Sequence, residues 1–115
     1  MKKDFERIYD QLQFWGLTNN QYDFSTRWLG QCDSYFSSMK ARDAEPGPQA
    51  ALALLSRLRC FNERLRANDR VRTDAQMGQL ANMLTMEAET ISNGLYETSL
   101  QRVAERQCGK EEQPL

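Results

Sequence analysis

Apolar residues recur every three or four positions along most of this chain, which is the spacing of amphipathic α-helices. Before residue 68 the pattern forms four runs, which predict helices over about residues 4–15, 20–29, 33–42 and 50–68. Gly16 and Gly30 end the first two runs, and the segment 43–48, with two prolines around a glycine, ends the third. The fourth run is the most hydrophobic, so we expect its helix at the centre of the core.

A further apolar stripe follows residue 73. Its members stand at steps of three or four, and they are Met77, Leu80, Leu84, Ala88, Ile91 and Leu95. The stripe predicts either one helix over about 74–107 or two helices, and the pair Asn93–Gly94, a common helix end, favours a break there. No alternating strand pattern is visible. The expected fold is therefore all-α, with four N-terminal helices followed by one long or two shorter helices.

The two short runs around Gly30 predict a helix-turn-helix unit, whose second helix can lie in the DNA major groove. Gly30 can adopt the left-handed conformation that ends the first helix, and Asp33 or Ser34 can cap the second. Phe36 and Met39 stand three residues apart and should both point inward. The same pattern also fits any pair of short amphipathic helices in an all-α domain.

Small residues form another face of the second helix. At helical spacing, this face consists of Ser34, Ser37, Ser38 and Ala41. It is flat enough to approach a base edge. Lys40 and Arg42 stand at the end of the helix, where a phosphate can be reached.

Two stretches relate this segment to known proteins. Leu17–Thr18 before the first helix, and the run LGQCDSYFSSM over residues 29–39, are similar to the entry, glycine turn and serine-rich recognition helix of the lambda-repressor-like (XRE/Cro-type) helix-turn-helix family. A downstream Pro-x-x-x-Leu-x-x-Leu helix is matched by Pro48, Leu52 and Leu55. In this chain Ser25 stands five residues before Gly30, where four is usual in that family.

The segment also resembles short uncharacterised bacterial proteins that share a QxxFSxxWLG sequence followed by SYF. Together the resemblances cover about residues 11–65. They divide the chain into a helix-turn-helix domain over 1–70, a C-terminal helical extension over 71–109 and a flexible tail over 110–115.

The resemblance implies a set of residues on double-stranded DNA. The expected DNA-binding residues are Asn20, Gln21, Asp33, Ser34, Tyr35, Ser37, Ser38, Lys40 and Arg42. Asn20 and Gln21 would contact phosphates, whereas Tyr35 and the serines would face base edges. Asp33 would accept a hydrogen bond from a cytosine amino group. Lys40, Arg42 and part of the Arg57–Arg72 cluster would meet backbone phosphates.

Charge is unevenly distributed along the chain. Residues 1–72 carry a net charge of +3 and residues 73–115 one of −4. This contrast fits a basic DNA-facing part and an acidic partner-facing part, and it equally fits two solvated faces that attract one another. No apolar run approaches the roughly 18 residues of a membrane span, and the N-terminus lacks the apolar core of a secretory signal, so we expect no membrane contact and a cytoplasmic protein.

The residues needed for catalysis are mostly absent. The chain has no histidine, no glycine-rich phosphate loop and no close cysteine pair, so we expect no enzyme activity, no cofactor and no metal site. The three cysteines are expected to be reduced thiols, with Cys60 near a core face. An alternative hypothesis for Cys32 is that it is a redox-sensitive thiol at a helix N-terminus. Glu87, Glu89 and Glu97 are expected on a solvated helix face.

Two functions fit this sequence. The favoured one is a small DNA-binding transcriptional regulator, dimerised through residues 74–107 because such proteins commonly read two half-sites. The alternative is a protein-binding adaptor, antiactivator or antitoxin that uses the acidic C-terminal helices and keeps the helix-turn-helix as a scaffold.

Overall fold

The structure is a computed structural model that describes residues 1–67 and 75–111, with the side chains of 1–67 and 75–97. Within these ranges the chain forms helices and no strand, which confirms the all-α expectation for this part of the molecule. The helices are α1 (Lys2–Phe14), α2 (Gln21–Asp23), the π-helical η1 (Phe24–Trp28), α3 (Tyr35–Ala41), α4 (Pro48–Arg66) and α6 (Ala75–Glu111).

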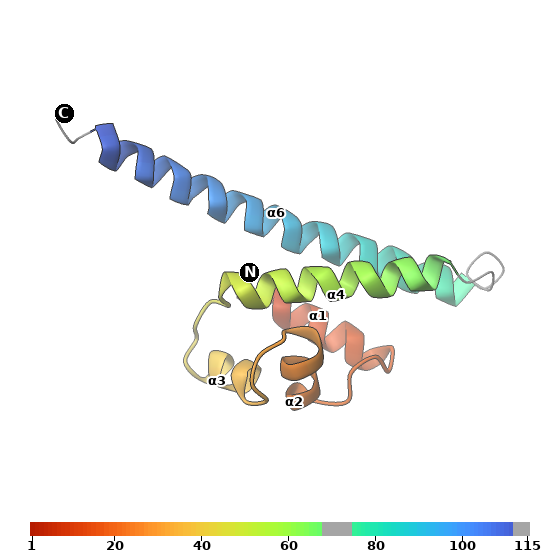
Figure 1. Cartoon of the computed structure of the whole chain (residues 1–115). Coiled ribbons are helices and arrows are strands. Elements are labelled where there is room, and N and C mark those ends of the chain that lie inside the picture. The colour runs from red at the N-terminus through yellow and green to blue at the C-terminus, as the bar shows by residue number, and fades with distance from the viewer. Residues whose placement is uncertain (68–74, 112–115) are drawn as a thin grey trace.

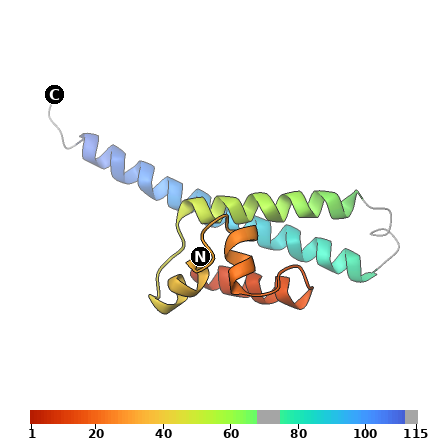
Figure 2. The ribbon, with the colours of Figure 1, turned by 60° about the horizontal axis from the view of Figure 1, so that its bottom comes forward.

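The molecule has a long helical pair and a group of short helices. α4 and α6 run antiparallel and side by side, and the second half of α6 continues past the N-terminus of α4 (Figure 1). The short helices α1, α2, η1 and α3 gather on one side of this pair, as both ribbon views show (Figures 1 and 2). α1 also touches α6 directly, so the short helices contact both long ones.

One core joins all these helices except α2, which has no buried residue. Its largest fully buried side chains are Phe5, Ile8, Leu12, Phe24, Leu29, Phe36, Leu54, Leu58, Leu84 and Ile91. Three of the aromatic rings meet at its centre, where Tyr9 and Phe36 lie 5.3 and 5.0 Å from the Phe24 ring. The stripe of α6 belongs to the same core, because Leu80, Leu84, Ala88 and Ile91 are buried in it. The first half of α6 is therefore packed into the domain that it follows.

α6 corrects one prediction. The break that we favoured at Asn93–Gly94 is wrong, because a single helix runs from Ala75 through Glu111. Gly94 lies inside this helix and beside Met1: a Cβ at this position would lie 2.9 Å from the terminal methyl of the Met1 side chain. The helix also includes Lys110 and Glu111, which were expected to begin the tail, whereas residues 112–115 and the predicted boundary at 70–71 lie outside the described residues.

The helix ends follow local backbone chemistry. α1 ends at Gly16, whose φ of +75° is left-handed, and the Leu17 N–H donates to the Leu12 carbonyl as expected for this type of cap. α3 ends in the same way at Asp43, with a φ of 51°, and the Ala44 N–H donates to the Met39 carbonyl. Gly30 has a φ of +63°, which confirms the turn predicted for it.

The π turn of η1 accommodates an extra residue. The Leu29 N–H donates to the carbonyl of Phe24, five residues back, at 3.1 Å, and a π turn differs from an α turn by one inserted residue. Phe24 and Trp28, the first and last residues of this turn, are both buried in the core.

Ser25 makes the main polar link between η1 and α3. It is fully buried, donates to the Gln21 carbonyl at 2.8 Å and accepts from the Phe36 N–H at 3.0 Å. Ser34 occupies the N-cap position of α3, but neither its side chain nor that of Asp33 makes the predicted cap bond. The side chain of Ser25, in the preceding helix η1, accepts from the Phe36 N–H in the first turn of α3 instead.

Candidate nucleic-acid interface and arginine pocket

α3 lies at the edge of the molecule with its aromatic side in the core. Phe36 and Met39 are 0% and 4% exposed, which confirms that they point inward. On the other side, Ser34 and Ala41 are exposed, whereas Ser37 and Ser38 are half-buried. We call this outer side, residues 34, 37, 38 and 40–42, the α3 face.

Several predicted DNA-binding residues already hold hydrogen bonds within the protein. Asn20 caps α2, because its Oδ1 accepts from the Asp23 N–H at 2.9 Å. The Tyr35 hydroxyl accepts from the Gly47 N–H at 3.0 Å, so the half-buried ring secures the loop before α4. Ser37 donates to the Ser34 carbonyl. Gln21 is half-buried, and Asp33 is exposed beside α3.

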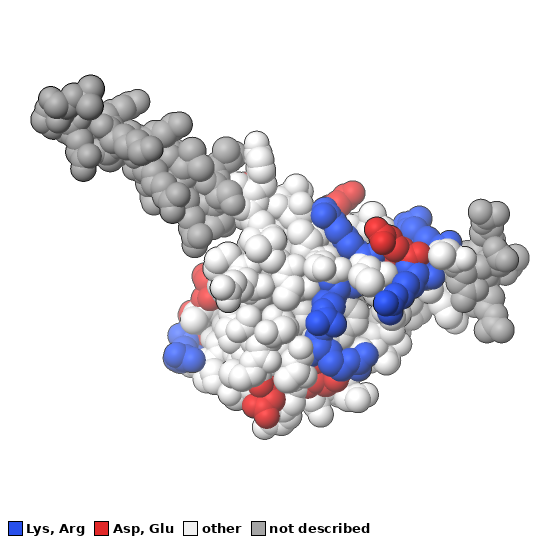
Figure 3. All heavy atoms as spheres, viewed as in Figure 1, with Lys and Arg blue, Asp and Glu red and all other residues white. Residues whose placement is uncertain are grey.

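The α3 face is only modestly basic. Lys40 is exposed and its Nζ lies 5.4 Å from the centre of the Phe36 ring, a cation–π distance, while Arg42 is exposed at the helix end. Asp33 is the nearby acid with no ion pair in the described part of the chain, since Asp43 is paired with Lys2. Figure 3 shows a small group of basic atoms beside α3, separated by uncharged surface from a larger one over α4.

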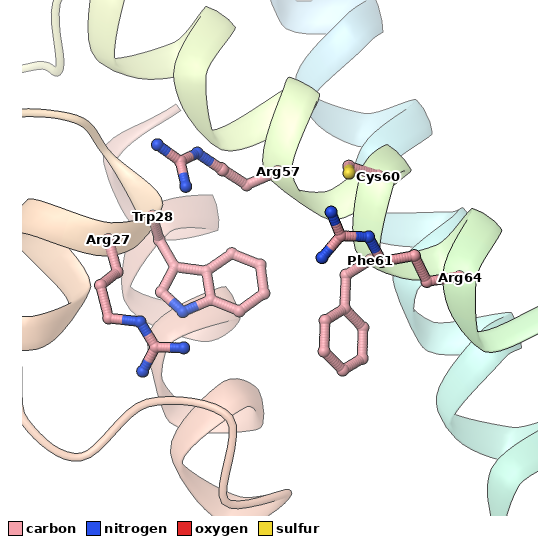
Figure 4. A pocket seen from close by; sticks show the side chains of 6 residues that line it. All are labelled: Arg27, Trp28, Arg57, Cys60, Phe61 and Arg64. Carbon is pink, nitrogen blue, oxygen red and sulfur yellow. The ribbon is translucent and has the colours of Figure 1, made fainter.

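The larger basic group surrounds a pocket between η1 and α4. Its volume is about 190 Å³, and its lining consists of Arg27, Trp28, Arg57, Cys60, Phe61 and Arg64. Four of these residues come from one face of α4, where positions 57, 60, 61 and 64 are neighbours at helical spacing. Arg27 approaches from η1, on the far side of the Trp28 indole (Figure 4). We call this site the arginine pocket.

Aromatic side chains form one wall of the arginine pocket. The rings of Trp28 and Phe61 lie 6.1 Å apart, centre to centre. Trp28 is fixed from behind, because its Nε1 donates to the Leu17 carbonyl at 3.3 Å. This hydrogen bond fixes the indole, while Arg57, Cys60 and Arg64 at the rim of the pocket are exposed.

Among the side chains that the structure describes, one carboxylate pairs with a pocket arginine. Asp23 accepts from Arg27 at 3.4 Å, whereas Arg57 and Arg64 make no ion pair with any described residue. Burial by itself raises the pKa of the Asp23 carboxyl, but hydrogen bonds from Thr18, the Asn19 N–H and Arg27 outweigh it, so the pKa lies below its ordinary value. The Asp23 carboxylate is thus ionised at neutral pH and accepts hydrogen bonds from all three of these donors.

Sequence reasoning found the arginines of α4 but not the pocket. Cys60 was expected near a core face, but it is exposed, and Phe61 beside it is half-buried. The repeated spacing of 57, 60, 61 and 64 was a usable signal. Arg27 and Trp28 lie some thirty positions earlier, and only the fold brings them to α4. Arg70 and Arg72 lie outside the described residues.

Glu87 also corrects a prediction. It was expected on a solvated face, but it is 7% exposed and bonds twice to Arg7 of α1, at 2.8 Å from Nη2 and 3.2 Å from Nε. The Glu87 hydrogen bond raises the pKa of Arg7 despite partial burial. This ion pair fastens α1 to α6 and lies apart from both basic surfaces. Glu89 and Glu97 are exposed, as expected.

The described ranges hold neither a cluster of metal ligands nor a membrane-spanning helix. No group of three or more cysteine, aspartate or glutamate side chains there is arranged to hold a metal ion. No helix in the same ranges is both long and apolar enough to cross a membrane.

Comparison with known proteins gives a family and no activity. Residues 5–107 match a family of unknown function (DUF6626). The chain belongs to this family. No curated protein and no solved structure matches it. In this member the matched range includes the α3 face, the arginine pocket and the Arg7–Glu87 pair.

Proposed function

We propose that this DUF6626 protein is a small DNA-binding regulator that presents α3 to the major groove. The supporting observation is the division of α3 into two sides. Its aromatic side is packed in the core, whereas Ser34, Lys40, Ala41 and Arg42 are exposed. A helix with side chains is about 10–12 Å wide and the major groove about 12 Å, so a helix at the edge of a domain can enter it.

Fewer residues are assigned to DNA contact than the sequence suggested. Ser34 and Ala41, seven residues apart on one side of α3, face the bases, and Lys40 and Arg42 meet phosphates. Asn20 and Tyr35 support the fold through their bonds to Asp23 and Gly47. The resemblance to lambda-repressor-like proteins supports the same docking, with η1 as the helix that precedes the recognition helix.

Enrichment of genomic fragments by the purified protein, followed by fluorescence anisotropy on an enriched duplex, tests this function. We expect Lys40→Gln with Arg42→Gln to weaken binding about tenfold or more, because two charge-assisted phosphate contacts are lost. The matched control is Gln79→Glu with Asn82→Asp on exposed positions of α6, which changes the net charge equally. Equal losses in both pairs of variants would show that only overall charge matters.

A second change separates groove contact from charge neutralisation. Ser34→Glu with Ala41→Glu adds carboxylates to two exposed positions of the α3 face and leaves the core unchanged. We expect loss of the enriched fragments with an unaltered circular dichroism spectrum. Retention of the same fragments would contradict docking through α3.

The exposed side of α6 supports a second candidate, binding to another protein or to a second copy of this chain. Met86 and Tyr96 are 65% and 66% exposed there, whereas the inward stripe is already used in the core. A homodimer would therefore form through the outer side of α6. Sedimentation velocity tests it: Met86→Glu with Tyr96→Glu should convert a dimer to a monomer. A monomeric wild-type protein that enriches no DNA would favour the adaptor function.

A further inference from the structure

The arginine pocket concentrates positive charge that the described residues neutralise only in part. Arg27, Arg57 and Arg64 line a space of about 190 Å³ together, and among the described side chains a carboxylate contacts Arg27 alone. Like charges held close together repel, and solvent and salt reduce this cost without removing it. A bound anion between the three side chains would turn the repulsion into attraction.

Guanidinium groups favour one class of anion. Arginine presents a planar fork of N–H donors that matches the oxygens of phosphate or carboxylate in a bidentate manner. The three arginines that line the pocket come from two elements, Arg27 from η1 and the other two from α4, and in Figure 4 their guanidinium groups lie on different sides of the Trp28 indole. A phosphate, with several oxygens in different directions, can accept from donors on different sides, whereas a carboxylate has only two oxygens.

The remaining lining indicates what accompanies the phosphate. Trp28 and Phe61 supply an aromatic wall next to the arginines. Drug-sized ligands occupy pockets of about 300–1,000 Å³, so 190 Å³ suffices for a phosphate and part of an adjoining ring or chain. The rest of such a molecule would extend along the exposed surface of α4.

We infer that the arginine pocket is a phosphate site, in which Arg27, Arg57 and Arg64 hold the phosphate group of a small phosphorylated molecule and Trp28 and Phe61 contact its apolar part. The site differs from the α3 face in position and in residues. It does not depend on the proposed DNA binding, because it takes a phosphate group whether or not α3 docks in a groove.

Cys60 provides a built-in reporter for this site. Its thiol is free, exposed and part of the pocket lining, while Cys32, also free and exposed, lies outside the pocket and serves as an internal reference. The experiment measures the alkylation rate of each cysteine by mass spectrometry. The additions are inorganic phosphate, adenosine monophosphate, adenosine, duplex DNA, and chloride at matched ionic strength.

We expect phosphate and adenosine monophosphate to slow alkylation of Cys60 and leave Cys32 unchanged, with the nucleotide acting at lower concentration and adenosine without effect. Slowing by duplex DNA alone would support a phosphate site and identify strand phosphates as the source. Equal slowing by chloride, or no slowing by any phosphate, would overturn the inference.

Variants make the assignment specific. Arg57→Gln should weaken the protection by adenosine monophosphate about tenfold or more, whereas Arg59→Gln, an exposed arginine of α4 outside this pocket, should leave it unchanged. Asp23→Asn removes the carboxylate bound to Arg27 and should strengthen protection about twofold to fivefold. Equal effects of Arg57→Gln and Arg59→Gln would overturn the site. Lys40→Gln with Arg42→Gln should leave protection unchanged, so failure of DNA binding and failure of this site are distinguishable.

Discussion

The short helices of residues 1–47 and the long pair α4 and α6 are held by different contacts. The long helices pack through a regular apolar stripe, with Leu54 and Leu58 on one helix and Leu84 and Ile91 on the other fully buried. The short helices have too few turns to be stable alone, and specific polar bonds lock them to each other. Ser25 to the Phe36 N–H is the clearest example.

This difference explains where the two candidate surfaces occur. The α3 face belongs to a short helix whose position depends on a few buried hydrogen bonds. The arginine pocket lies where the two parts meet, with Arg27 from the short helices and Arg57 from α4. Changes that disturb one part should therefore affect the surfaces unequally, and we consider them from the largest expected effect to the smallest.

The Arg7–Glu87 pair tests how strongly the two parts are joined. Arg7→Ala leaves a carboxylate whose side chain is 9% exposed without its partner, so we expect a loss of about 3 kcal/mol in the free energy of unfolding. Glu87→Ala should cost less, about 1 kcal/mol, because the Arg7 side chain is 44% exposed and can be hydrated. Urea denaturation at neutral pH measures both values.

A control accompanies this pair. Arg59→Ala, at an exposed arginine without an ion pair among the described residues, should change stability by less than about 0.5 kcal/mol. Equal costs for Arg7→Ala and Glu87→Ala would contradict the asymmetric burial.

Ser25 tests whether a buried hydrogen bond fixes α3. Ser25→Ala leaves the Phe36 N–H without an acceptor in the core, and we expect a loss of about 2 kcal/mol. Ser37→Ala is the matched control, because among the described residues this half-buried serine bonds to the Ser34 carbonyl alone, one turn back in the sequence. Thermal or urea unfolding distinguishes the two serines. A loss below about 0.5 kcal/mol in Ser25→Ala would show that α3 is held by apolar packing alone.

Asp23 gives the smallest effect and a defined pH dependence. Because its folded pKa lies below the unfolded value of about 3.9, its contribution is fully present above that pH and is lost as pH falls through the folded pKa. Asp23→Asn should therefore be less stable than wild type at neutral pH, by about 1 kcal/mol at most. Unfolding measured from pH 7 to pH 2 should show the difference closing below about pH 4. A difference independent of pH would contradict this assignment.

The sequence predicted the parts of this fold that depend on periodicity. The spacing of Phe5, Ile8 and Leu12 identified α1 and its buried side, and the glycines at 16 and 30 marked real left-handed turns. Periodicity reports only which side of a helix is apolar. It could not show that Gly94 lies inside α6, beside Met1, instead of ending the helix.

The polar cross-links were less predictable, because each joins residues distant in sequence. Ser25, not the expected Asp33 or Ser34, accepts a hydrogen bond from the first turn of α3. Glu87 accepts from Arg7, which lies eighty positions earlier. The arginine pocket depends both on helical periodicity, which the sequence shows, and on a contact between distant residues, which it does not. Its α4 side was visible as helical spacing, whereas Arg27 joined it only through the packing of η1 on α4.

The salt dependence of binding to an enriched duplex tests the assignment of DNA to the α3 face most directly. Each lost phosphate contact lowers the slope of log affinity against log salt by about 0.9, so Lys40→Gln with Arg42→Gln should reduce it by about 2 relative to wild type. Gln79→Glu with Asn82→Asp should leave the slope unchanged. An unchanged slope in the Lys40 and Arg42 variant would contradict contact between α3 and the DNA backbone.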